Sequence, residues 1–371
     1  MKFEITKKNL LYSLQKIHGL VIKNISYPIL ENILIEINNG LLYLTATNLE
    51  LEIQVKTSKI SLYESGTTTV SGKKILSICR KLPDDTNITI ILKKSKLKIF
   101  SKNSHYSLQT LPSINFPNFK KTKHQIKFSI TQTALKNIIF FTQFSMAIQD
   151  LRYFLNGLHL EIKNRHLYAI ATDGYRMAIS KTPLEHPYQY HSVILPRKGI
   201  IELLKLLDNS STLASIEINS NYFQICIDNV TFTSKIIDAK FPKYASIITK
   251  RFKKKVIINV LLFKQALSRI IILSNELFQG ILIKNDKKKL RITTSNQYDE
   301  KACEILEIIY INSDIEISIN ANYMLDILNV IKQNEICLWI DNFNASIQIR
   351  YNYCENKCDY KSIYVLMPLQ T

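Results

Sequence analysis

The sequence predicts an α+β fold made of three tandem copies of one domain, each with two helices packed on antiparallel sheet. One observation is an internal repeat, because FPNF at Phe116–Phe119 returns as FPKY at Phe241–Tyr244. Another is that the pattern of the opening MKFEITKKNLLYSLQKI recurs from Ile126 and again from Lys255. This period is far longer than that of solenoid or propeller repeats, so each copy is expected to be a domain. The expected domains are residues 1–124, 125–250 and 251–371.

Each copy opens with a strand that leads into a helix. Phe3, Glu4 and Ile5 alternate in polarity, as a half-buried strand does, and the following positions return every three or four residues, as on a helix. The expected helix faces are Leu10, Leu11, Leu14 and Ile17 in the first copy, Leu135, Ile138, Ile139 and Thr142 in the second, and Leu262, Ala266, Arg269 and Ile270 in the third.

Two or three short strands follow the first helix of each copy. In the first copy they are expected at Ile33–Ile37, Leu41–Thr45 and Leu51–Val55. The sequence Asn38-Asn39-Gly40 predicts a hairpin turn between the first two.

A second amphipathic helix and three strands complete each copy. The second helices are expected at about Lys73–Lys81, Lys198–Leu207 and Ala321–Ile331. The middle strands of the closing three are expected at Lys96–Ser101, Tyr222–Asp228 and Ala345–Arg350.

The chain of 371 residues has a formal net charge of +19, which favours a nucleic-acid partner. Much of the excess lysine, however, falls where turns are expected, as at Lys93, Lys94 and Lys96. Ile, Asn, Lys and Tyr are also frequent throughout. Such lysine runs are most simply solvated faces, so the charge alone does not establish a function.

Apolar runs and cysteines indicate the compartment. No window of about 18 uncharged apolar residues occurs and no signal peptide opens the chain, so we expect no membrane span and a cytoplasmic protein. Of six cysteines only Cys354 and Cys358 are close, and no second pair stands at zinc-ligand spacing. We therefore expect reduced thiols, no metal and no cofactor.

Catalytic motifs are missing from the sequence. Eight glycines leave little room for a phosphate-binding loop, and neither HExxH nor Gly-x-Ser-x-Gly occurs. Asp173 and Arg176 could serve acid–base chemistry, although Thr-Asp-Gly first indicates a turn. Binding is favoured over catalysis, and an enzyme with a cleft near Asp173 and Arg176 stays open as an alternative.

Motifs along the whole chain resemble the bacterial DNA polymerase III beta subunit family, the processivity sliding clamps. They occur in the family's order with almost no change in length. The segments are MKF at the start, YPILENILIE at Tyr27–Glu36, ICRKLP at Ile78–Pro83, FSMAIQDLRYFLNG at Phe144–Gly157, ATDGYRMA at Ala171–Ala178, PRKGIIEL at Pro196–Leu203, FTSKIIDAKFPKY at Phe232–Tyr244, ILSNE at Ile272–Glu276 and YVLMPL at Tyr364–Leu369.

The resemblance implies a non-enzymatic homodimer, whose three clamp domains per subunit join head to tail into a closed six-domain ring. Such a ring encircles double-stranded DNA without sequence specificity and makes the replicative polymerase processive. Its implied partners are the DNA polymerase III catalytic subunit, clamp-loader subunits and other clamp-motif proteins, which bind a cleft between domains 2 and 3. A rival interpretation is a monomer that docks on one face of DNA without encircling it.

The resemblance also implies three sets of site residues. Those expected to contact DNA are Lys23, Asn24, Lys73, Arg80, Gln149, Tyr153, Phe154 and Lys198. Those expected in the partner-peptide cleft are Leu155, Thr172, Gly174, Tyr175, Arg176, Met177, Pro242, Ile247, Asn320, Tyr323, Ser346, Val365 and Met367. Those expected at the dimer interface are Lys74, Tyr106, Leu108, Ile272, Leu273, Asp299, Glu300 and Glu304.

Three of these positions depart from the family pattern. Asn24 stands where arginine is common, and neighbouring Lys23 is the candidate to supply the missing charge. Tyr175 and Met177 stand where histidine and leucine are frequent, so the shape of the cleft is expected to differ.

Overall fold

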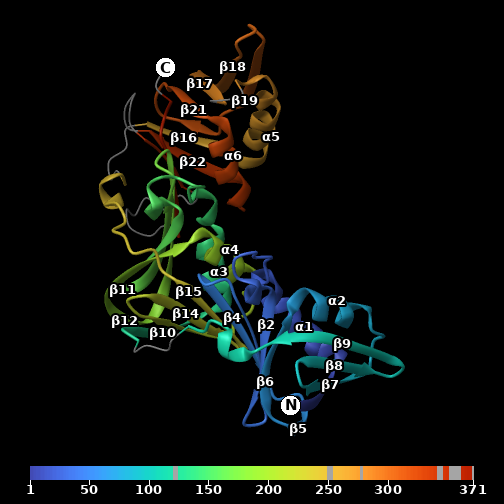
Figure 1. Ribbon diagram of the computed structural model, residues 1–371. Coiled ribbons are helices and arrows are strands. Elements are labelled where there is room, and N and C mark those ends of the chain that lie inside the picture. Colours follow the sequence, from blue (N-terminus) through green and yellow to red (C-terminus); the bar gives the residue numbers. More distant parts are fainter. Residues whose placement is uncertain (120–123, 249–253, 276–278, 341–345, 351–360, 370–371) are drawn as a thin grey trace. The chain divides into compact units, whose positions relative to one another are not determined.

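The computed structural model describes residues 1–119, 124–248, 254–275, 279–340, 346–350 and 361–369 (Figure 1). Its internal contacts divide the chain into two compact units. Unit 1 comprises residues 1–133 and 201–236, and unit 2 comprises residues 134–200 and 237–371. The division falls inside two helices, α3 (Gln132–Phe140) and α4 (Arg197–Leu206).

The described strands of unit 1 form a 13-stranded sheet in the order β10-β13-β14-β15-β4-β3-β2-β6-β9-β8-β7-β1-β5. Neighbouring strands are antiparallel, as in the β2–β3 and β14–β15 pairs. The strands are β1 Lys2–Thr6, β2 Asn32–Asn38, β3 Leu41–Thr47, β4 Leu51–Thr57, β5 Ser61–Glu64, β6 Gly66–Ser71, β7 Asn87–Lys93, β8 Lys96–Ser101, β9 Ser104–Leu111, β10 Ile126–Thr131, β13 Leu213–Ile218, β14 Tyr222–Ile227 and β15 Val230–Lys235.

The predicted hairpin turn between β2 and β3 is confirmed. Asn38 pairs with Leu41, which leaves Asn39 and Gly40 as a two-residue loop. Their φ angles are 49° and 76°. Two successive left-handed residues are what a type I′ turn requires, and Asn-Gly adopts them at low cost.

Helices α1 (Lys7–Ile17) and α2 (Gly72–Lys81) of unit 1 pack against each other. Each continues directly from a strand, and the last strand residue caps the helix. The Thr6 hydroxyl accepts from the Asn9 N–H and the Ser71 hydroxyl accepts from the Lys74 N–H. Both helices bury one apolar stripe, which consists of Leu10, Leu14 and Ile17 in α1 and Ile75, Leu76 and Cys79 in α2.

The described strands of unit 2 form two antiparallel sheets, with the orders β11-β12-β24-β23-β22-β16-β20 and β19-β18-β17-β21. The strands are β11 Gly157–Thr172, β12 Arg176–Pro196, β16 Lys254–Asn259, β17 Gly280–Asp286, β18 Lys289–Ser295, β19 Lys301–Glu307, β20 Tyr310–Ile311, β21 Glu316–Asn320, β22 Glu335–Ile340, β23 Ile347–Arg350 and β24 Ser362–Leu366. Helices α5 (Val260–Ile270) and α6 (Ala321–Val330) pack together and share one apolar core with strands of both sheets.

The order of elements repeats three times and confirms the predicted α+β repeat. A strand, a helix, a group of strands, a second helix and three strands run from β1 to β9, from β10 to β15 and from β16 to β24. The second helices α2, α4 and α6 begin and end within one residue of the predicted positions. The middle closing strands are β8, β14 and β23, although Ala345 of the third prediction lies outside the described residues.

Two local expectations are wrong. The strands after α3 are long, because β11 and β12 pair over their whole length across register shifts between Ile162 and His166. A bulge of this kind absorbs extra residues without ending the ladder. In α5 the buried stripe is Phe263, Ala266, Leu267 and Ile270, while Leu262 is 48% exposed and Arg269 points to solvent. The apolar run VLLF offers two stripes one residue apart, and tertiary packing selects the second.

Backbone pairing crosses the boundary between successive copies at two places. In unit 1, β15 of the second copy pairs with β4 of the first, so Thr233 lies opposite Glu52. In unit 2, β24 of the third copy pairs with β12 of the second, so Val365 lies opposite Met177. The candidate site is built on the second of these junctions.

We predict that Gly40→Ala lowers the free energy of unfolding by about 1 kcal/mol, because the left-handed backbone conformation at this position is less favourable for alanine than for glycine. The added methyl group meets no atom within 4 Å, so no steric term contributes. Urea-induced unfolding measures the change. Asn39→Gly in the same turn is the control and should be neutral or slightly stabilising; equal stability of Gly40→Ala and the natural chain would contradict the turn.

Candidate functional site

The candidate site lies where β12 and β24 meet in unit 2. Met177 pairs with Val365, and two residues further along the chain the Met367 N–H donates to the Tyr175 carbonyl at 2.9 Å. We call the surface formed by Tyr175, Met177, Ile247, Val365 and Met367 the β12–β24 surface.

The β12–β24 surface has a buried floor and an exposed rim. Met177 and Val365 are buried in a small apolar cluster with Ile170, Ile179 and Ile363. The rim residues Tyr175, Ile247 and Met367 are 62%, 42% and 43% exposed. Apolar side chains that are partly exposed beside a closed floor can bind apolar anchors without rearranging the core.

A tight turn, Asp173–Tyr175, forms one end of this surface. One oxygen of the Asp173 carboxylate accepts from the backbone N–H groups of Tyr175 (3.0 Å) and Arg176 (2.9 Å), which closes the turn predicted from Thr-Asp-Gly. Gly174 has a φ of +94°, and a Cβ there would meet the Arg152 guanidinium at 3.1 Å. The left-handed conformation thus favours glycine at this position, and a larger residue would also displace the Arg152 guanidinium by a few tenths of an ångström.

Arg176 makes four contacts with three parts of unit 2. Its guanidinium donates to the other oxygen of Asp173 (2.9 Å), to Asp326 on α6 (2.5 Å) and to the Phe144 carbonyl (2.9 Å). It also lies 4.4 Å from the centre of the Tyr323 ring. Only 10% of its side chain is exposed. The Asp173–Arg176 pair therefore holds the turn against α6.

The remaining cleft candidates surround this framework. Thr172 caps the turn through its hydroxyl, Asn320 caps α6 by accepting from the Tyr323 N–H at 3.0 Å, and Leu155 is buried. Pro242 is exposed, and Ser346 is half-buried just before β23. Backbone pairing and the contacts of Arg176 thus bring Thr172, Tyr175, Met177, Asn320, Tyr323, Val365 and Met367 together, and the place of Leu155, Pro242 and Ser346 in the cleft stays a prediction. The same contacts add Phe144, Arg152 and Asp326, which were not among the expected cleft residues, although Phe144 and Arg152 lie in the motif FSMAIQDLRYFLNG.

Three DNA-contact candidates of unit 2, Gln149, Tyr153 and Phe154, lie on the loop that precedes β11. Gln149 is exposed at the tip with a φ of 56°, and Tyr153 stands 58% exposed beside Phe154. Asn156 closes the loop by donating to the Asp150 carbonyl and accepting from the Asp150 N–H.

Two arginines anchor the base of this loop. Arg197 donates to the carbonyls of Met146 (2.8 Å) and Asn156 (3.0 Å), which places its neighbour Lys198, exposed in the first turn of α4, next to the loop. Arg152 binds Asp150 through two hydrogen bonds and donates to the Asp173 carbonyl at 3.3 Å. Hydrogen bonds to Arg152 lower the pKa of Asp150 to about 2.

The DNA-contact candidates of unit 1 form two groups. The Asn24 side chain accepts from the Tyr27 N–H at 2.9 Å and closes a turn, while Lys23 beside it is exposed. Lys73 and Arg80 lie on the exposed side of α2, and the charges of both act on the imidazole of His18. Burial and then the charges of Arg80 and Lys73 lower the pKa of His18. The positive potential that these side chains create is thus felt by a neighbour.

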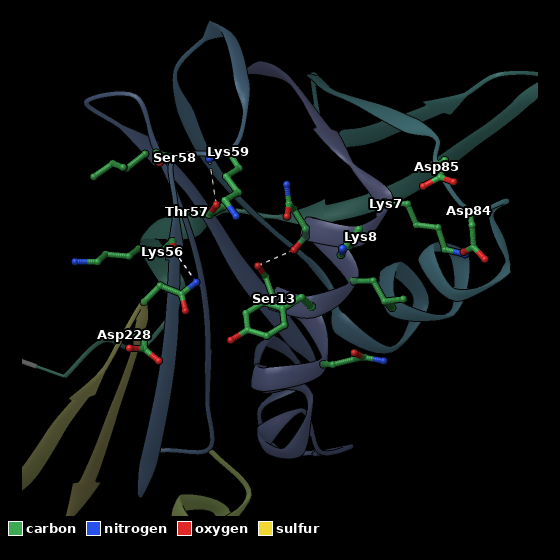
Figure 2. Close-up of a pocket in the computed structure, with 16 residues that line it drawn as sticks. Lys7, Lys8, Ser13, Lys56, Thr57, Ser58, Lys59, Asp84, Asp85 and Asp228 are labelled. Carbon is green, nitrogen blue, oxygen red and sulfur yellow. Dashed lines mark hydrogen bonds and ion pairs between the residues drawn. The ribbon is translucent and has the colours of Figure 1, made fainter. Parts of the chain in front are cut away.

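A hollow of about 940 Å³ in unit 1, which the sequence did not predict, lies beside α1 (Figure 2). Lys8, Lys56 and Lys59 line it together with Asp85 and Asp228. The buried Lys7 ammonium at its edge is already bound to Asp84 at 2.7 Å and to the Leu82 carbonyl. Because cations and carboxylates are mixed, the hollow has no single sign of charge.

The dimer-interface candidates lie on separate units. On unit 1, Lys74 is exposed and Tyr106 and Leu108 are half-buried on β9. On unit 2, Ile272 is 77% exposed, and Leu273 beside it is half-buried. Asp299 and Glu300 are exposed, whereas Glu304 accepts two hydrogen bonds from Arg269 of its own chain. Their pairing across a ring remains a prediction.

Three family models match the chain in sequence order. The DNA polymerase III beta subunit N-terminal domain matches residues 1–120, its central domain matches residues 129–243 and its C-terminal domain matches residues 245–370.

Full-length relatives and solved structures agree with these matches. The beta sliding clamps of Buchnera aphidicola subsp. Rhopalosiphum padi and Escherichia coli K12 are 42% and 36% identical over 370 residues, with complete coverage of both chains. A crystal structure of a DnaN sliding clamp (DNA polymerase III subunit beta) from Pseudomonas aeruginosa bound to griselimycin is 34% identical. It has a TM-score of 0.95, again over both whole chains. The corresponding clamp from Bartonella birtlesii is 30% identical, with a TM-score of 0.93.

We predict that Arg152→Ala raises the pKa of Asp150 from about 2 toward its ordinary value of 3.8, because the side-chain hydrogen bonds that favour the carboxylate are lost. Carboxyl carbon shifts followed against pH measure it. A lowered native pKa stabilises the fold above the ordinary value, and this stabilisation is lost as the pH falls toward 2. Lys163→Ala, at an exposed site, is the control; an unchanged Asp150 titration in Arg152→Ala would show that the pair does not form in solution.

Proposed function

The chain belongs to the DNA polymerase III beta subunit family, and we propose that it closes a ring around duplex DNA and holds partner proteins on the β12–β24 surface. It is a DNA sliding clamp of three tandem clamp domains. The proposal concerns how this particular chain binds DNA, itself and its partners. The domain boundaries at 124/125 and 250/251 are part of the proposal.

Ring closure is supported by the way successive copies join. Both junctions within the chain, β15–β4 and β24–β12, are antiparallel backbone pairings between neighbouring copies. A third junction of the same head-to-tail kind between two subunits would close a six-domain ring, because a repeated heterologous contact ends only when its rotation closes. We assign Lys74, Tyr106 and Leu108 of one subunit and Ile272, Leu273, Asp299, Glu300 and Glu304 of the other to this contact.

Contact with DNA is assigned to lysine, arginine and aromatic side chains around the ring. Lys23, Lys73, Arg80 and Lys198 are exposed cations. Cations that face phosphates give attraction that is independent of sequence and weakens with salt. Such contacts suit a protein that holds DNA by enclosure and slides along it. Gln149 and Tyr153 on the exposed loop add polar and stacking contacts.

Partner capture is assigned to the β12–β24 surface. Its floor and rim are methionine, valine, isoleucine and tyrosine, and flexible methionine side chains repack around different apolar anchors. One surface can then serve the polymerase catalytic subunit, the clamp loader and further clamp-motif proteins in turn. We propose a cytoplasmic binding protein without cofactor, metal or catalytic activity of its own.

The test of enclosure uses the topology of DNA. Loaded onto nicked circular DNA, the protein should remain bound through gel filtration at high salt, and linearising the circle should release it, because a closed ring leaves only over an end. The double variant Ile272→Ala with Leu273→Ala is the control, since loss of the apolar seam should give monomers that are retained on neither DNA.

The result that overturns enclosure is equal retention of the natural chain on circular and linear DNA. A monomer by analytical ultracentrifugation would favour the rival that docks on one face. Turnover that Asp173→Asn abolishes without unfolding the protein would favour an enzyme.

We predict that Met367→Ala weakens binding of a fluorescein-labelled peptide from the C-terminus of the same organism's polymerase catalytic subunit by roughly tenfold. Truncating a contacting apolar side chain costs on the order of 1–2 kcal/mol. Fluorescence anisotropy gives the affinity. Retention on circular DNA should be unchanged, and an unaltered peptide affinity would remove Met367 from the partner site.

A further inference from the structure

One wall of the β12–β24 surface is a segment that lies outside the sheets. Residues 237–243 have no regular secondary structure, and a single 3₁₀ turn, Tyr244–Ser246, follows. This segment supplies Pro242 and Ile247 to the proposed partner site. Since it is not a strand, its position depends on what its side chains contact.

Inward side chains recur every three or four residues along the segment. The Phe241 ring stacks on the His159 ring with a centroid distance of 4.4 Å and an interplanar angle of 5°. Tyr244 lies edge-on to Phe241, and Ile248 packs on the apolar cluster that contains Met177 and Val365. Between them Pro242, Lys243, Ala245 and Ser246 are exposed.

Polar groups of the sheet hold the same segment at two points. The Tyr244 hydroxyl donates to the carboxylate of Glu161 on β11. The fully buried Gln348 of β23 donates to the Ile247 carbonyl at 3.2 Å. Glu161 and His159 are two residues apart on β11 and therefore face the same side of the strand. Burial lowers the pKa of His159 to about 4, so this ring is neutral when it stacks.

Glu161 is only 7% exposed, and nothing in the family pattern identified it. A carboxylate is costly to bury unless hydrogen-bond donors compensate for its lost hydration. It also acts on Tyr168, whose pKa is raised by burial and then by the Glu161 charge. Tyr168 packs on the same apolar cluster beneath Met177. The carboxylate thus sits where the sheet, the cluster and the segment meet.

We propose that Glu161, acting through the Tyr244 hydroxyl, is a positioning residue that sets the 241–248 segment as the wall of the partner site. It contacts no partner itself. With the bond made, Pro242 and Ile247 are held at a fixed separation from Met177 and Met367. Without the Tyr244–Glu161 hydrogen bond, Phe241 still stacks on His159, but the residues after Phe241 are more mobile. A peptide that binds must then fix their conformation. This inference rests on the partner-binding function proposed above.

The test compares a variant that lacks the Tyr244 hydroxyl with variants that change its acceptor, Glu161. Tyr244→Phe removes only the hydroxyl and should weaken binding of the fluorescein-labelled polymerase peptide by roughly tenfold, the range expected for a hydrogen bond to a charged group. Glu161→Leu should weaken it by a similar factor. Glu161→Gln keeps a carbonyl acceptor for the Tyr244 hydroxyl and should restore most of the affinity.

A local readout separates positioning from general damage. Hydrogen–deuterium exchange of residues 241–248 should become faster in Tyr244→Phe, while exchange of the repeat counterpart at residues 116–119 stays unchanged. Retention on circular DNA should also be unaffected. Tyr63→Phe is the matched control, because Tyr63 also donates to a glutamate, Glu4, but at an exposed site in unit 1. It should change neither affinity nor exchange.

The outcomes distinguish this inference from the proposed function. If Met367→Ala lowers the affinity for the peptide but Tyr244→Phe binds the peptide as tightly as the natural chain does, Glu161 has no positioning role. Weaker binding without faster exchange in 241–248 would also overturn the inference, since the loss would then arise elsewhere. If the natural chain does not bind the peptide at all, the partner-binding function falls and this inference with it.

Discussion

Antiparallel backbone pairing between successive copies is the constraint on which the rest of the structure depends. Each copy alone ends in strands with unsatisfied backbone groups, and such edges readily pair with another chain. The β15–β4 and β24–β12 pairings use these edges to join neighbours, so the chain satisfies its backbone and sets the geometry of its junctions at once. The β12–β24 surface, which we propose as the partner site, lies on the strands that make one of these junctions.

The two junctions have the same backbone arrangement but different side-chain chemistry. Where Val365 faces Met177 in unit 2, Thr233 faces Glu52 in unit 1. Burial raises the pKa of Glu52, and its carboxylate accepts from the Phe119 N–H in the FPNF segment. An apolar anchor that reached this junction would meet a carboxylate already bound to backbone. The two junctions thus share one backbone arrangement, and of the two the β24–β12 junction has the apolar floor that the proposed partner site requires.

Much of the fold could be predicted from the sequence because local patterns carry it. The Asn39-Gly40 turn, the second helices and the strand Lys96–Ser101 were identified by turn chemistry and periodicity. The stripe of α5 was missed because VLLF fits two helical faces and only the core decides between them. The residues of the candidate site likewise divide into those that a local motif indicates and those that it does not. Arg176 and Met177 lie in the ATDGYRMA motif. Asp326, in contrast, lies 150 residues along the chain from Arg176, which it contacts, and Glu161 lies within β11, outside every motif. No local pattern marks a residue whose role is set by a distant contact.

Every α-helix in the described part of the chain begins at the residue after a strand, without a connecting loop. At four of these joints the last strand residue also caps the helix. An inserted residue at such a joint would rotate the helix by about 100° relative to the strand, turning its apolar stripe away from the core. Insertions are therefore expected at hairpin ends and at bulges such as that in β12 rather than at these joints.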